Sequence, residues 1–320
     1  MTGEPMPRIA VLLMGPTGAG KSDLALRLVE RLPLEIVSVD SAMIYRGMDI
    51  GTAKPAADIL AGVAHHLIDI VDPAQSYSAG EFVRDALAAM NEIWSRGRHP
   101  LLVGGTMLYF HALTQGLADL PQSDPAIRAE IEAAAAADGW AAPHRELATV
   151  DPAAAARIHV NDPQRIQRAL EVFRVTGAPI TRLQQFRVPA LQGVDVVEYA
   201  LAPGERAWLH AGIERRFGSM MEAGFLQEVS RLYERGDLSP ADPSMRCVGY
   251  RQLWQHLAGE STIQEATTKG IIATRQLAKR QWTWLRRRPL AKWIDPVHPD
   301  MAQAVISALS SRIENSGLTS

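Results

Sequence analysis

Residues 9–22 read IAVLLMGPTGAGKS, and this stretch decides the fold. Its apolar run predicts a buried strand over residues 8–14, and a glycine-rich turn follows that strand directly. Beyond the turn, Leu24 and Leu28 recur with the period of a helix that ends before Pro33. A strand, a glycine turn and a helix in this order predict the first unit of a parallel α/β sheet.

The glycine turn matches the pattern G-x-x-x-x-G-K-[ST] at every fixed position. Its residues are Gly15, Pro16, Thr17, Gly18, Ala19, Gly20, Lys21 and Ser22. Glycines let backbone N–H groups turn inward around phosphate oxygens, the following helix points its positive end at them, and Lys21 adds a cation. The Ser22 hydroxyl is a ligand for Mg²⁺ in such a turn. The motif predicts binding of a di- or triphosphate and leaves open whether phosphorus or carbon is attacked.

Three further segments are expected to complete the sheet. Residues 35–39 and 101–103 are short apolar runs typical of buried parallel strands, and residues 194–201 predict a returning strand. Ser78 and Glu81 predict a capping box, because each side chain can satisfy an orphan backbone N–H at the start of a helix. Strands that alternate with helices in this way predict a doubly wound sheet.

Polar residues follow several of these apolar runs, at the strand ends where open α/β sheets bind ligands. Three interpretations of Asp40 remain open: a Mg²⁺ ligand, a general base, or a cap of the turn with Ser41. Asp69 also follows apolar residues and is a weaker candidate for a Mg²⁺ ligand. Gly104 and Gly105 allow a ligand to approach the backbone closely, and the hydroxyl of Thr106 either contacts a phosphate or leaving-group oxygen or caps the next helix.

The pattern of strands and helices stops at residues 120–187, which contain alanine-rich helical segments and no convincing strand. Asp124 and Asp162, each followed by proline, predict helix starts in this region. The expected fold class is α/β: a P-loop NTPase-like parallel sheet flanked by helices, with an all-helical insertion domain. The predicted domains are residues 1–119 and 188–320 for the core and 120–187 for the insertion.

The overall composition excludes several classes of protein. With 47% hydrophobic and 21% charged residues, the chain of 320 residues is typical of a globular protein. Its apolar runs are too short to cross a bilayer and its N-terminus lacks the layout of a secretory signal, which favours the cytoplasm. One cysteine excludes an internal disulfide and a multi-cysteine metal site, and the nine histidines are scattered.

The net charge is only −2, yet two segments carry a local excess of basic residues. Residues 266–294 contain no acidic residue and eight basic ones: Lys269, Arg275, Lys279, Arg280, Arg286, Arg287, Arg288 and Lys292. In residues 163–188, Glu171 is the one acidic residue beside five arginines. Arg165 and Arg168 lie near a helix N-terminus, where basic side chains oppose the helix dipole, so phosphate contact is the preferred interpretation. Both segments are candidate contacts for a polyanion.

Three smaller basic groups have less specific interpretations. Residues 246–251 place a glycine and a tyrosine between two arginines, which suits RNA contact and equally suits a turn packed on a core tyrosine. Arg215 and Arg216 are candidates for a second phosphate clamp. Helical spacing puts one further set on a shared face: Arg275, Lys279, Trp282 and Arg286.

Several of these strings together resemble one family, the tRNA dimethylallyltransferases, over residues 9–285. The matching strings are GPTGAGKS at 15–22, VDS at 39–41, YRGMDIGTAKP at 45–55, HLID at 66–69, VGGT at 103–106, NDPQR at 161–165, RCVGY at 246–250 and TRQLAKRQ at 274–281. Strings of this length in this order are far more specific than the phosphate loop alone. Eukaryotic relatives carry a zinc finger that a chain with one cysteine cannot form, so the resemblance implies the bacterial type.

The resemblance implies transfer of a dimethylallyl group from dimethylallyl diphosphate to the N6 amine of the adenosine 3′ of the tRNA anticodon, with Mg²⁺. It implies that the phosphate loop holds the diphosphate, that Asp40 is the general base, and that Thr106 and Arg216 bind the leaving diphosphate. The helical insertion would grip the anticodon stem-loop. The segments that match tRNA contacts are Asp40, Ser41, Ala42 and Met43; Gln164, Arg165, Ile166, Gln167 and Arg168; Arg246, Cys247, Val248, Gly249, Tyr250 and Arg251; and Lys279, Arg280 and Arg286.

Three other functions of phosphate-loop proteins explain this sequence less well than transfer of a dimethylallyl group to tRNA. A small-molecule kinase that uses ATP leaves the basic segment 266–294 unexplained. A nucleic-acid-dependent NTPase usually has a strand that ends in Asp-Glu, whereas residues 101–103 are followed by Gly-Gly-Thr. A plant-type adenylate isopentenyltransferase would not need the tRNA-contacting segments. We expect an enzyme that has no membrane partner and acts as a monomer.

Overall fold

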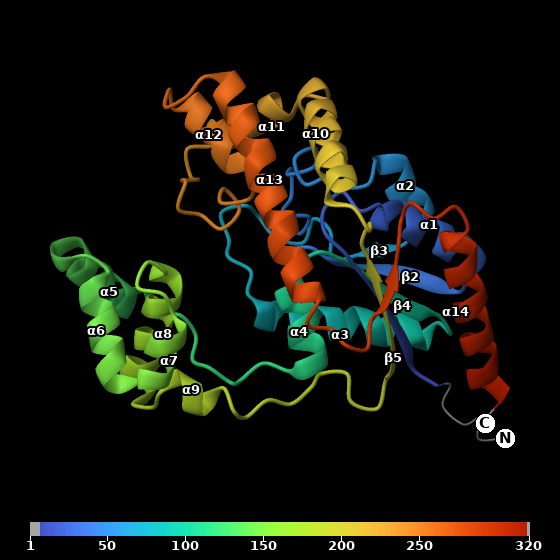
Figure 1. Ribbon diagram of the computed structural model, residues 1–320, viewed down its shortest axis with the longest axis horizontal. Coiled ribbons are helices and arrows are strands. Elements are labelled where there is room, and N and C mark those ends of the chain that lie inside the picture. Colours follow the sequence, from blue (N-terminus) through green and yellow to red (C-terminus); the bar gives the residue numbers. More distant parts are fainter. Residues whose placement is uncertain (1–6, 319–320) are drawn as a thin grey trace. The chain divides into compact units, whose positions relative to one another are not determined.

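The computed structural model describes residues 7–318, with side chains up to residue 315. Within this range six parallel strands form one sheet in the order β3-β2-β4-β1-β5-β6 (Figure 1). The strands are β1 (Ile9–Met14), β2 (Leu34–Val39), β3 (His65–His66), β4 (His99–Gly104), β5 (Asp195–Leu201) and β6 (Lys292–Ile294). Since all of them are parallel, their carboxyl ends share one edge of the sheet. The phosphate loop, Asp40 and Gly105 all follow strands at this edge.

Helices cover both faces of the sheet. These helices are α1 (Lys21–Arg31), α3 (Ala79–Ser95), α4 (Met107–Gln115) and α14 (Met301–Leu318). Leu28 of α1 and Leu309 of α14 belong to one apolar core with β1, while α3 and α4 lie along the other face (Figure 1). Phe82 of α3 stacks on Tyr109 of α4 with ring centroids 4.2 Å apart. The capping box of Ser78 and Glu81 is present at the start of α3, as predicted.

A second apolar core lies among helices beyond the carboxyl edge of the sheet. These helices are α10 (Arg206–Glu222), α11 (Phe225–Tyr233), α12 (Tyr250–Leu257) and α13 (Ile263–Leu285), and they pack together in Figure 1. The segment between β2 and the short helix α2 (Ala57–Gly62) joins this core through Ile44 and Met48. Helix α13 belongs to both cores, because Ala266 lies in the helical one and Ala278 packs beside the sheet. It therefore carries side chains to the edge where the phosphate loop lies.

Residues Ala112–Ala190 form a separate compact unit with its own core. Its helices are α5 (Pro125–Asp138), α6 (Ala141–Val150), α7 (Pro152–Arg157), α8 (Pro163–Thr176) and α9 (Ile180–Leu183). Asp124 and Asp162 cap α5 and α8 with their side chains, as the cap-then-proline pattern predicted. The predicted helical insertion, residues 120–187, lies inside this unit.

The predicted fold class, a parallel α/β sheet of the P-loop type, is confirmed, although the sheet has two strands more than expected. Strands β3 and β6 were not predicted, because each has only two or three residues and no detectable alternation. None of the helices described is long and apolar enough to span a membrane.

Candidate active site

The phosphate loop between β1 and α1 adopts a cradle that only its glycines permit. Gly18 and Gly20 have φ angles of 81° and 83°, in the left-handed region that side chains disfavour. A Cβ atom on Gly15 would lie 2.4 Å from the carbonyl oxygen of Leu201, so the loop also passes too close to β5 for any side chain. The Nζ atom of Lys21 donates to the Pro16 carbonyl at 2.8 Å. The loop is thus closed on itself, with Lys21 turned inward.

Two adjoining cavities meet at this loop. The smaller, of about 190 Å³, is lined by Lys21, Ser22 and Arg216, and the larger, of about 500 Å³, extends toward α10, α12 and α13. Six residues line both cavities: Thr17, Asp40, Thr52, Gly105, Arg216 and Gln281. A single ligand can therefore extend from the smaller cavity into the larger one.

The smaller cavity holds two cations, Lys21 and Arg216, together with the carboxylates of Asp23 and Asp40. Burial and, to a smaller extent, the nearby Arg216 lower the pKa of Lys21 to about 8, while Asp40 opposes the change. Burial also lowers the pKa of Arg216, again opposed by Asp40. Two partly desolvated cations thus share one carboxylate, an arrangement that a bound phosphate group would stabilise.

Asp40 and Thr106 lie on adjacent strand ends and are joined through Ser41. The Oδ1 atom of Asp40 accepts the N–H of Ala42 at 2.8 Å and that of Met43 at 3.4 Å. The Oγ1 atom of Thr106 accepts the N–H of Ser41 at 3.0 Å and lies 3.3 Å from its hydroxyl. Asp40 therefore does cap its turn, but with one oxygen only. Thr106 lines the larger cavity, and its hydroxyl holds the 40–41 turn instead of capping α4.

The larger cavity combines an apolar wall with Arg216 and two further arginines. Phe217, Met220 and Trp284 contribute to the wall, and Arg246 and Arg280 also line it. Cys247 lies in the same wall, where burial and then the charge of Asp40 raise the pKa of its thiol to about 12. Such a cavity suits a ligand with an apolar part, an aromatic ring and phosphates at its periphery.

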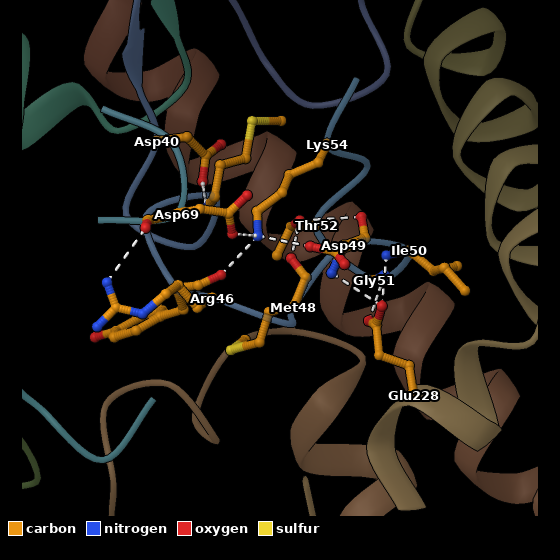
Figure 2. Close-up of polar contacts among 12 residues, drawn as sticks. Asp40, Arg46, Met48, Asp49, Ile50, Gly51, Thr52, Lys54, Asp69 and Glu228 are labelled. Carbon is orange, nitrogen blue, oxygen red and sulfur yellow. Dashed lines mark hydrogen bonds and ion pairs between the residues drawn. The ribbon is translucent and has the colours of Figure 1, made fainter. Parts of the chain in front are cut away.

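The segment that follows Asp40 is held in place by two buried charged side chains, shown in Figure 2. Lys54, whose side chain is 3% exposed, donates to Asp49 at 2.7 Å and also pairs with Asp69. Glu228 is 1% exposed and accepts the N–H groups of Asp49, Ile50 and Gly51 at 2.9, 2.7 and 3.1 Å. Asp69 thus pairs with Lys54 and does not line either cavity.

Sequence reasoning missed three residues of this site: Lys54, Glu228 and Gln281. Lys54 and Gln281 fall in strings that carried the family resemblance, which was the available signal for them. Glu228 lies in an ordinary amphipathic helix, where nothing in the sequence marks it as buried.

Predicted RNA-contacting residues occupy different environments. The larger cavity is lined by Asp40, Ser41, Ala42, Arg246, Cys247, Val248 and Arg280, and the smaller one by Met43. Gly249 is buried, and Arg251 is exposed outside both cavities. Tyr250 also lines the larger cavity, but it is 0% exposed and its hydroxyl donates to Glu228, so the segment packs on a buried tyrosine, while RNA contact by its neighbours stays a prediction.

The basic face of α13 lies partly outside the site. Lys279, Trp282 and Arg286 line a separate cavity of about 350 Å³ with Arg275. Glu214 of α10 pairs with Arg275 at 2.7 Å. The basic face of α13 therefore has an acidic partner, although the segment 266–294 itself contains no acidic residue.

In the helical unit, Arg168 already has partners within the protein, and its contact with phosphate stays a prediction. Its guanidinium donates to the buried Glu171 at 2.6 Å and to the Pro121 carbonyl at 2.7 Å. Ile166 is 0% exposed, and the amide of Gln167 bonds to Glu132. Gln164 and Arg165 are exposed and remain predicted contacts.

Comparison with known proteins agrees with this geometry. The model of the family described as IPP transferase matches residues 43–288. A tRNA dimethylallyltransferase of Thioalkalivibrio sulfidiphilus is 55% identical over 97% of this chain and 97% of its own. The crystal structure of a full-length tRNA isopentenylpyrophosphate transferase from Bacillus halodurans is 36% identical, with a TM-score of 0.70, and covers 98% of this chain and 99% of its own.

A structure of a eukaryotic dimethylallyltransferase acting on tRNA has a TM-score of 0.82 and covers 96% of this chain and 80% of its own. At 24% identity this likeness concerns the fold alone. The family match and the near full-length identity confirm the resemblance found in the sequence, and the chain belongs to the IPP transferase family of tRNA dimethylallyltransferases.

Proposed function

We propose that this enzyme transfers a dimethylallyl group from dimethylallyl diphosphate to the N6 amine of the adenosine 3′ of the anticodon in tRNA, releasing diphosphate. One observation carries the proposal. Lys21 and Arg216 line a small cavity at the phosphate loop, this cavity opens into a larger one with an apolar wall, and Asp40 and Arg216 line both. The reacting carbon of a prenyl diphosphate lies between its charged and apolar parts, so it would lie where the two cavities meet.

The diphosphate occupies the smaller cavity in this proposal. Lys21 and Arg216 supply two cations, and the N–H groups of the loop around Gly18 and Gly20 supply donors. When the bond between carbon and oxygen breaks, negative charge grows on the leaving diphosphate. Cations that are already desolvated and in place stabilise this charge without reorganising. A bound diphosphate also replaces the Pro16 carbonyl as the partner of Lys21.

Asp40 removes the proton from the attacking amine. As the nitrogen bonds to carbon it becomes positively charged and acidic, and a carboxylate within hydrogen-bond reach can then accept its proton. The Oδ1 atom of Asp40 holds the turn through Ala42 and Met43, and in this proposal the other oxygen, Oδ2, accepts the proton. The cap and the base are therefore two functions of one side chain.

The residues at the phosphate loop fit a Mg²⁺ ion. In proteins Mg²⁺ is usually held by one or two side-chain oxygens together with phosphates and water, and the exposed hydroxyl of Ser22 lines the smaller cavity. When bound, the ion neutralises charge on the diphosphate. No cluster of three or more His, Cys, Asp or Glu side chains suited to a metal occurs among the described residues, which agrees with a site completed by the substrate.

The RNA lies against basic side chains in this proposal. The target base must leave its stack to enter the larger cavity, where Arg246 and Arg280 can contact the flanking phosphates. Exposed Arg165 at the start of α8 is the proposed contact of the helical unit with the anticodon stem, and Lys279 and Arg286 stay further predicted contacts. We propose that the enzyme acts as a monomer in the cytoplasm, where its RNA substrate is found.

An acceptor assay tests this function. Purified protein, Mg²⁺ and labelled dimethylallyl diphosphate are incubated with two anticodon stem-loop RNAs that differ only by adenosine or guanosine 3′ of the anticodon. Label in the adenosine RNA alone supports the proposal. Absence of label from both RNAs, with ATP consumed when small-molecule acceptors are supplied, would support a kinase instead.

A further inference from the structure

The side-chain amide of Gln281 joins the two loops that border the site. Its Oε1 atom accepts the N–H of Thr17 at 2.9 Å, and its Nε2 atom donates to the carbonyl of Gly105 at 2.9 Å. Gln281 is 9% exposed and comes from α13, 264 residues away from Thr17. A single amide thus uses both its acceptor and its donor on the backbone of different loops.

These loops have different tasks in the proposed reaction. Thr17 belongs to the phosphate loop, which follows β1 and holds the diphosphate. Gly105 follows the neighbouring strand β4 and leads into Thr106 and Met107, which line the larger cavity. The distance between the loops therefore sets the distance between the donor carbon and the acceptor base.

The contact is tight and depends on the amide group. A Cβ atom added to Gly105 would lie 2.3 Å from Nε2 of Gln281, so the glycine is needed for this approach. An amide, like a protonated carboxyl group, has its acceptor and its donor on separate atoms, so it can accept from Thr17 and donate to Gly105 at the same time. A carboxylate would keep the first bond, lose the second and place a negative charge beside the phosphate loop.

We infer that Gln281 is a positioning residue for the transfer reaction, one that fixes the phosphate loop against the loop after β4 and so aligns donor and acceptor. This rests on the proposed function. Because Thr17 N–H is held by Gln281, the diphosphate is bound by Lys21, Arg216 and the other N–H groups of the loop. Loss of the amide should therefore affect alignment more than donor binding, and a misplacement near 1 Å lowers a rate about 100-fold.

The test compares Gln281→Met, which has a similar shape but no amide, with Gln264→Met, a change at an exposed glutamine in the first turn of the same helix. Single-turnover transfer to the stem-loop RNA, equilibrium binding of dimethylallyl diphosphate and the melting temperature are measured for each. We expect Gln281→Met to transfer about 100-fold more slowly with nearly unchanged donor affinity, and Gln264→Met to match the wild type.

Two further variants keep the inference testable if Gln281→Met is unstable. Gly105→Ala pushes the amide away without changing residue 281, and we expect the same loss of rate. Gln281→Glu should regain activity relative to the wild type as the pH falls, because a protonated carboxyl group restores the donor to Gly105.

Two results would overturn the inference. One is a wild-type rate in Gln281→Met and Gly105→Ala. The other is a loss confined to donor affinity or melting temperature, without any pH-dependent recovery in Gln281→Glu. A wild-type enzyme that binds dimethylallyl diphosphate but modifies no RNA would instead contradict the proposed function itself.

Discussion

The buried carboxylate of Glu228 accepts the hydroxyl hydrogen of Tyr250 at an O–O distance of 2.5 Å. The same carboxylate accepts three consecutive N–H groups from residues 49–51, so one side chain connects α11, the start of α12 and the segment before Thr52 (Figure 2). Burial and this negative charge raise the pKa of Tyr250 above its usual value. Since Thr52 lines both cavities, Glu228 holds the wall of the site without touching it.

Replacing Glu228 by alanine should destabilise the protein strongly. Four donors, one of them buried and three partly buried, would lose their acceptor, and we expect the free energy of unfolding to fall by about 3 kcal/mol or more. Urea denaturation measures the loss, with Glu234→Ala, at an exposed glutamate just after the same helix, as the control. Equal stability of the two variants would show that the contacts of Glu228 do not hold the segment.

Binding of the donor should weaken at alkaline pH. Lys21 binds phosphate only when protonated, and its pKa of about 8 in the free protein means that this charge is lost above pH 8, not above the usual 10.5. We therefore expect kcat/KM for dimethylallyl diphosphate to fall as the pH rises through about 8. In Lys21→Arg the guanidinium stays charged, so this fall should be absent even if the overall value is lower. A fall of equal size in both proteins would contradict the assignment.

Arg168 and Arg165 should have opposite roles in the helical unit. Burial alone would raise the pKa of Glu171, but hydrogen bonds from Arg128 and Arg168 hold it below its usual value. We expect Arg168→Ala to lower the opening free energy of α8 by about 2 kcal/mol, measured by hydrogen exchange. Arg165→Ala should leave α8 stable and weaken stem-loop RNA binding, with a shallower dependence on salt. The reverse pattern would support the phosphate interpretation of Arg168.

Cys247, the one cysteine of the chain, should resist alkylation in the folded enzyme. The thiolate is the reactive form, and a pKa raised from 9.0 to about 12 leaves little of it at pH 8. We expect iodoacetamide to react on the order of 1,000-fold more slowly than in urea, because each unit of pKa above the pH lowers the thiolate fraction tenfold. Intact-mass measurements over time give both rates. Similar rates with and without urea would show that the thiol is not desolvated.

The sheet and the phosphate site could be predicted because their signals are local. Apolar runs, a glycine pattern and cap-then-proline pairs each act within a few residues, so β1, α1 and α8 follow from sequence alone. Asp40 and Arg216 were also found, the first from its place after a strand and both from the family resemblance. Strands as short as β3 and β6 carry no such periodicity.

The roles that the sequence did not reveal belong to residues whose partners lie far away along the chain. Glu228 and Gln281 act on backbone groups that are 176 or more residues away along the chain, and a backbone acceptor or donor leaves no mark on the partner's side chain. The protein partners of Arg168 were not foreseen for a related reason. Its position opposes the helix dipole, but the buried Glu171 that compensates for it becomes evident only when α5 and α8 pack together.

The central claim is that Asp40 removes the proton from an amine that attacks a donor bound at the phosphate loop. Asp40→Asn tests it most directly, because the amide oxygen can still accept the N–H groups of Ala42 and Met43 and keep the turn. We expect unchanged binding of dimethylallyl diphosphate and single-turnover transfer to adenosine RNA that is about 100- to 10,000-fold slower. Transfer at the wild-type rate, or a loss explained entirely by weaker donor binding, would contradict the account.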